Sequence, residues 1–149
     1  MDPVISIFKE RIKQAIATGH TLRIQGGNTK HFYGEHNTSH TVLDTREHAG
    51  VVSYEPSELV VTVRAGTPLA QLGQLLSTQG QCLAYEPPHF GASATVGGMV
   101  AAGLAGPSRA NVGGVRDHVL GAKLINGLGE ELTFGGQVMK NVAGYDVSR

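Results

Sequence analysis

The segment from residue 87 to residue 106 limits the possible folds of this chain more than any other. It is almost free of charge and rich in glycine and alanine. Pro87 and Pro88 fix φ at its entry, and Ser93 and Thr95 are candidate N-caps for a short helix running to about Gly103. A helix of such small residues lets another backbone, or a ligand, approach closely.

Gly97 and Gly98 fall in the first turn of this expected helix, where glycine is a poor helix former. In one interpretation the missing side chains make room for a large ligand, and the free N–H groups of the helix start bind a phosphate. In the other, the helix is packed tightly in a protein core. Both interpretations stay open on this segment alone.

Two helices and several strands are expected around it. Apolar side chains at helical spacing predict an amphipathic helix over residues 1–18, with Asp2 as its cap and Gly19 at its end. Thr67 as cap and Pro68 in the first position open a second helix. The predicted strands are 21–25, 41–44, 50–54, 59–65 and 81–85, then a hairpin of 118–125 and 131–134 around Asn126-Gly127.

The segment Gly26–Gly34 follows the first strand directly. Two adjacent glycines and then polar residues describe a loop whose backbone N–H groups can face an anion, and Lys30 would add a positive charge. No Walker Gly-Lys-Ser/Thr follows, and the Rossmann Gly-x-Gly-x-x-Gly spacing is absent. An ordinary turn is the alternative that these residues leave open.

Composition excludes several classes of protein. The formal net charge is zero, which argues against a general nucleic-acid binder. Cys82 is the only cysteine, so no internal disulfide can form and a reducing compartment is expected, and its apolar neighbours predict a buried thiol. The N-terminus shows no signal pattern, and no apolar run is long enough to span a bilayer. His31, His36 and His40 lack companion ligands, so no metal site is predicted.

Four motifs in a fixed order carry a resemblance to a known family. They are Gly26-Gly27-Asn28-Thr29, Val63–Thr67, Gly91–Gly106 and Lys140–Asp146. This set resembles the FAD-binding domain of the vanillyl-alcohol-oxidase type of flavoprotein, also called the PCMH type. Within that family the chain is most similar to the FAD-binding subunits of bacterial glycolate oxidases, through residues 87–91, 105–109 and 116–121.

The resemblance implies an α+β fold of two lobes with FAD in the cleft between them. Residues 1–55 would form a small lobe with a helix and mainly parallel strands. Residues 56–149 would form a larger, more antiparallel lobe. Domains of this family continue through a further strand and a cap domain, so the resemblance implies a chain truncated before both and inactive by itself.

The resemblance also implies which residues line the FAD site. The pyrophosphate loop would comprise Gly26, Gly27, Asn28, Thr29 and Lys30. The opposite wall would comprise Pro87, Pro88, Gly91, Ser93, Ala94, Thr95, Gly97, Gly98 and Ala101. Some relatives attach flavin to a histidine after the paired glycines. Because Asn28 stands at that place, non-covalent FAD is expected. No catalytic residue is assigned.

The activity implied is oxidation of a 2-hydroxy acid such as glycolate, with electrons leaving through FAD. The implied partners are a larger flavin subunit and an iron–sulfur subunit, and the implied location is the cytoplasm, peripheral to the inner membrane through these partners. The alternative, from another class, is a non-catalytic module that docks on a catalytic flavoprotein subunit. Substrate, electron acceptor and oligomeric state are not determined by these residues.

Overall fold

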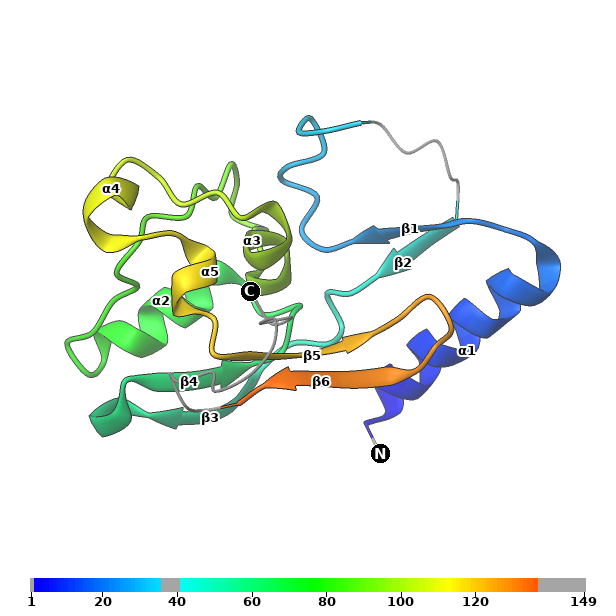
Figure 1. Cartoon of the computed structure of the whole chain (residues 1–149), viewed down its shortest axis with the longest axis horizontal. Helices are drawn as coiled ribbons and strands as arrows, with labels where there is room; N and C mark the ends of the chain where they lie inside the picture. Colours follow the sequence, from blue (N-terminus) through cyan, green and yellow to red (C-terminus); the bar gives the residue numbers. More distant parts are fainter. Residues whose placement is uncertain (1, 36–40, 137–149) are drawn as a thin grey trace.

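The computed structural model describes residues 2–35 and 41–136 and confirms a mixed α+β architecture. The elements, in order, are α1 (Pro3–Thr18), β1 (Leu22–Gln25), β2 (Thr41–Asp44), β3 (Val51–Glu55), the 3-10 turn η1 (Pro56–Glu58), β4 (Val60–Val63), α2 (Leu69–Ser77), α3 (Val96–Ala102), α4 (Arg109–Val112), α5 (Val115–His118), β5 (Gly121–Ile125) and β6 (Glu131–Gly135). Helices α2–α5 gather at one end of the molecule, above β3 and β4 in this view, and α1 lies at the other end (Figure 1).

Helix α1 begins and ends as its sequence predicts. The Asp2 carboxylate accepts a hydrogen bond of 3.0 Å from the Val4 N–H, and Gly19 ends the helix in the left-handed conformation at φ 67°. Phe8 and Ala15 are buried. The Arg11 guanidinium donates to the Val42 carbonyl at 2.7 Å, which ties the helix to strand β2.

The strands form three two-stranded sheets. β1 and β2 are parallel, and Gln25 lies opposite Asp44 at the end of the pair. β3 pairs antiparallel with β4, and β5 with β6. The β3–β4 pairing crosses the boundary expected after residue 55, and the division of the chain into two lobes stays a prediction.

The core lies between α2 and α3. Helical spacing predicts an apolar face of α2 made of Leu69, Leu72, Leu75 and Leu76. Three of them are buried and pack with Met99 of α3, whereas Leu75 is half-buried. Tyr85 joins this cluster, and its hydroxyl donates to the Met99 sulfur at 3.4 Å. This packing fixes the start of α3 against the rest of the molecule.

The cap expected for the second helix is wrong. Pro68 is the N-cap of α2, and the helix begins at Leu69. The Thr67 hydroxyl is fully buried and already engaged elsewhere, because it accepts from the Gly50 N–H at 2.9 Å and donates to the Arg64 carbonyl at 2.7 Å. Thr67 therefore stabilises the return of the chain from β4 rather than the start of α2.

The strand predicted over residues 81–85 is also wrong. The Gln81 N–H donates to the Leu76 carbonyl at the end of α2, and its side chain joins the Tyr54 hydroxyl to the Pro56 carbonyl. These bonds hold the segment in an irregular path, and Cys82 is exposed rather than buried.

Two further boundaries differ from the prediction. Strand β5 begins at Gly121, because residues Val115–His118 form helix α5, whose Gly114 N–H donates to the Asp117 carboxylate at 2.7 Å. Strand β4 covers only Val60–Val63, and it begins after Leu59 because that residue adopts a left-handed conformation at φ 56°. Among the described residues, no helix has the length and apolar character needed to cross a membrane.

Candidate functional site

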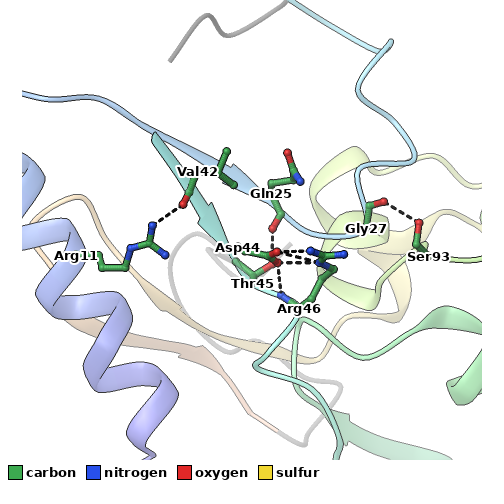
Figure 2. A network of polar contacts seen from close by, with 8 residues as sticks. All are labelled: Arg11, Gln25, Gly27, Val42, Asp44, Thr45, Arg46 and Ser93. Carbon is green, nitrogen blue, oxygen red and sulfur yellow. Dashed lines mark hydrogen bonds and ion pairs between the residues drawn. The ribbon is translucent and has the colours of Figure 1, made fainter. Parts of the chain in front are cut away.

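Two segments that the sequence singled out lie in direct contact. We call residues 26–33, after β1, the phosphate loop, and residues 90–95, before α3, the facing loop. The Ser93 hydroxyl donates to the Gly27 carbonyl at 2.8 Å (Figure 2). The structure thus brings together segments more than 60 residues apart in the chain.

Gly27 makes this contact possible. A Cβ added at Gly27 would lie 1.6 Å from the Ser93 carbonyl oxygen, and one added at Gly26 would lie 2.7 Å from the Thr95 hydroxyl. A side chain at Gly27 cannot be accommodated unless one of the two loops moves, because the obstructing atom belongs to the backbone. The paired glycines are therefore required by the close approach of the two loops.

The backbone N–H groups at the start of α3 are hydrogen-bonded within the protein, and this end of the helix is tightly packed. The N–H groups of Val96, Gly97 and Gly98 donate to the Thr67 carbonyl, the Ala65 carbonyl and the Thr95 hydroxyl, respectively. A Cβ at Gly97 would lie 2.8 Å from that of Ala65. The N–H groups at this helix start are therefore paired within the protein, and Gly97 is tightly packed. The place of Gly97 and Gly98 in the FAD site stays a prediction.

The phosphate loop, in contrast, presents N–H groups without partners. Within the described part of the chain, those of Gly27, Asn28 and Thr29 make no hydrogen bond. Asn28 has φ 57°, so the chain turns sharply here, as in the backbone concavities that bind anions. Lys30 adds an ammonium group to the same loop, and partial burial lowers its pKa from the ordinary value.

A polar network holds the base of the phosphate loop (Figure 2). The Thr45 N–H and hydroxyl both donate to the Gln25 carbonyl, at 2.9 and 3.3 Å. Hydrogen bonds from the Arg46 side chain hold the pKa of the Asp44 carboxyl below its ordinary value. The ends of β1 and β2 are thereby fixed where the loop leaves the sheet.

The predicted site residues differ in burial and in their place relative to the two loops. The structure brings Gly26, Gly27 and Thr29 together with Gly91, Ser93 and Thr95. The side chains of Ala94 and Thr95 are buried, at 1% and 2% exposure, so they shape the facing loop from within. The remaining predicted residues are the half-buried Pro87 and Pro88, Gly98 in the first turn of α3 and the exposed Ala101 in its last turn.

Some of the sequence hypotheses fall outside this description. His36, His40 and the motif Lys140–Asp146 lie outside the described residues. Within the described ones, no three histidine, cysteine, aspartate or glutamate side chains are grouped as a metal site requires. Sequence reasoning also missed Phe32 and Phe90, whose rings meet across the two loops. The signal was one phenylalanine in each of two singled-out segments, residues 26–34 and 87–91.

The fold and the paired loops are those of an FAD-binding flavoprotein domain. A family model described as "FAD binding domain" matches residues 8–147. The chain therefore belongs to this family, and FAD is its cofactor.

Individual relatives agree with this assignment. The chain is 56% identical over 140 residues, 94% of its length, to glycolate oxidase subunit GlcE of Escherichia coli. It is 30% identical over 125 residues, 83% of its length, to D-lactate dehydrogenase of Archaeoglobus fulgidus. It spans 40% of the first relative and 28% of the second. The resemblance to glycolate oxidase FAD-binding subunits is confirmed.

Solved structures support the fold. A structure of alkyldihydroxyacetonephosphate synthase superposes with a TM-score of 0.70 at 20% sequence identity. The match covers 95% of this chain and 26% of the synthase chain. At this identity the likeness concerns the fold alone, and it agrees with the PCMH-type FAD-binding fold expected from the sequence.

Proposed function

We propose that this chain supplies the pyrophosphate-binding part of the FAD site in a subunit that oxidises a 2-hydroxy acid. One observation carries the proposal: the phosphate loop is fixed against the facing loop, yet the N–H groups of Gly27, Asn28 and Thr29 have no partner in the described residues. Unpaired N–H groups at a sharp turn are suited to a bound anion.

These residues fit the cofactor. FAD carries two negatively charged phosphates, which need several N–H donors and a nearby positive charge. The phosphate loop would provide the donors, and the Lys30 ammonium would provide the charge. Gly91 and Ser93 would border the cofactor from the facing loop, and Asn28 offers no histidine nitrogen for covalent attachment, so the FAD would be held non-covalently.

When bound, FAD supplies the redox chemistry by accepting a hydride from the alcohol carbon of the substrate. The residues of this chain would hold and orient the cofactor. Glycolate and D-lactate, named for the two relatives above, are both 2-hydroxy acids, which supports this substrate class. We propose glycolate as the substrate because the relative with 56% identity is a glycolate oxidase subunit.

The partners and location belong to the same proposal. The E. coli relative is named as a subunit, which supports assembly with other subunits. We propose a larger flavin subunit and an iron–sulfur subunit as partners, in the cytoplasm and peripheral to the inner membrane through them. A pull-down that recovers neither subunit would contradict this part.

The visible spectrum of the purified chain, before and after addition of FAD, tests the function. We expect a bound-flavin absorption band, and weaker binding in Lys30→Ala than in the control Lys123→Ala, whose lysine lies on β5 away from the loops. The loss should shrink as ionic strength rises, because salt screens the attraction between Lys30 and the phosphates. A chain that binds no FAD yet captures a larger flavoprotein would instead support the docking module.

A further inference from the structure

Two exposed aromatic rings join the outer ends of the phosphate loop and the facing loop. Phe32 is 55% exposed and Phe90 is 56% exposed. Their ring centroids lie 5.1 Å apart at an interplanar angle of 86°, an edge-to-face contact. This geometry is the one that aromatic pairs prefer, and it contributes beyond the area that it buries.

The backbone at Phe90 is unusual. Its φ is 53°, in the left-handed region that bulky residues rarely adopt, and Gly91 follows at φ 146°. A conformation of this kind is unfavourable for a bulky residue and persists only where the surrounding structure holds it. The edge-to-face contact with Phe32 is one interaction that holds it here.

The phosphate loop contacts the Phe90 ring a second time. The Lys30 ammonium lies 5.9 Å from the ring centroid, within the range of a cation–π attraction. The His31 ring packs edge-to-face on Phe32 at 6.3 Å, and its Nδ1 lies 3.1 Å from the Asn28 carbonyl oxygen. The same loop that presents the unpaired N–H groups therefore holds Phe90 through two side chains.

We propose that Phe90 is a positioning residue for the FAD site, and this proposal rests on the function proposed above. The Phe90 ring contacts Phe32 and Lys30 of the phosphate loop, and these contacts fix the separation of the two loops on that side. The Ser93–Gly27 hydrogen bond fixes their separation at the base. A loop pair held in its binding conformation loses less entropy when FAD binds, so affinity rises and release slows.

Phe90→Gly and Phe90→Tyr test the ring separately from the backbone. Glycine adopts the left-handed conformation readily and lacks the ring, whereas tyrosine keeps the ring. We expect Phe90→Gly to bind FAD about threefold to tenfold more weakly and to release it faster, and Phe90→Tyr to bind like the parent. The measurements are FAD titration and stopped-flow release on the full chain.

Leu59→Gly is the matched control. Leu59 is also exposed, at 78%, and also has a positive φ, of 56°, but it lies at the turn between β3 and β4. It should leave FAD binding unchanged, and thermal unfolding confirms that each variant is folded. If Phe90→Gly binds FAD as tightly as the parent does, the positioning role is wrong.

A double-mutant cycle tests the pairing itself. Combining Phe32→Ala with Phe90→Gly should weaken FAD binding by less than the product of the two single effects, because either change alone removes the ring contact. Fully multiplicative effects would overturn the pairing. A parent chain that binds no FAD would overturn the proposed function as well, whereas a parent that binds FAD, with unaffected variants, would overturn the positioning role alone.

Discussion

Among the glycines of the described residues, Gly27 is the one where an added Cβ would come closest to another atom. In Gly27→Ala the new Cβ would lie 1.6 Å from the Ser93 carbonyl oxygen, whereas real Cβ contacts stay above 3.0 Å, so one loop must move by about 1.4 Å. Such overpacking destabilises proteins by about 1–3 kcal/mol. The displacement also breaks the Ser93–Gly27 hydrogen bond, worth about 0.5–1.5 kcal/mol. We therefore expect a loss of about 2–4 kcal/mol.

Urea unfolding with linear extrapolation measures this loss. The control is Gly73→Ala in the middle of α2, where nothing lies within 4 Å of the added Cβ. Because alanine is the better helix former, this variant should gain about 0.5–1 kcal/mol. The same two proteins should differ in FAD affinity, and only Gly27→Ala should lose it. A Gly27→Ala protein as stable as the parent would refute the inferred contact between the loops.

Three further changes have expected outcomes that unfolding experiments check. Thr67→Val leaves the Gly50 N–H without its partner in the interior and should cost about 1–3 kcal/mol, whereas Thr67→Ser should cost less. Asp2→Ala removes the cap of α1 and should cost about 1 kcal/mol of stability. Asp2→Asn, which keeps a side-chain oxygen that can accept from the Val4 N–H, is the control. Burial lowers the pKa of His48 in the folded protein. The contribution of neutral His48 to folding stability is therefore present above the unfolded-state pKa near 6.5, and it is lost as the pH falls through the lower folded-state pKa. His48→Gln should flatten this pH dependence, and an unchanged slope would contradict the assignment.

The parts of the fold that the sequence predicts are those determined by neighbouring residues. Helix α1 is bounded by Asp2 and Gly19, and both act within one turn of the helix. The apolar face of α2 follows from leucine spacing in the same way. These elements are predictable because their caps and periodicity lie in the local sequence.

The predictions that failed depend in part on contacts between residues far apart in the sequence. Thr67 has the sequence context of a helix cap, but its hydroxyl binds the Gly50 and Arg64 backbone instead. Gln81 opens an apparent strand, yet its N–H and side chain are engaged by α2 and by Tyr54. The Gly50 and Tyr54 partners lie 17 and 27 residues away along the chain, so nothing in the local sequence indicates them.

The candidate site shows the same division. The paired glycines and the facing segment can be recognised in the sequence, and the structure brings them together. The sequence does not reveal that the N–H groups of α3 are already paired, or that Phe90 meets Phe32. Those facts depend on the register between segments far apart in the chain. Of the two segments that the sequence offers as phosphate-binding, the structure leaves unpaired N–H groups on the phosphate loop and pairs those at the start of α3.

Amide chemical shifts of the ¹⁵N-labelled chain test this central claim most directly. Addition of FAD should shift the backbone N–H signals of Gly27, Asn28 and Thr29, while those of Gly97 and Gly98, whose N–H groups are paired within the protein, move little. Riboflavin, which lacks the phosphates, should leave the loop signals in place. Large shifts at Gly97 and Gly98 with none at Gly27–Thr29 would contradict the account.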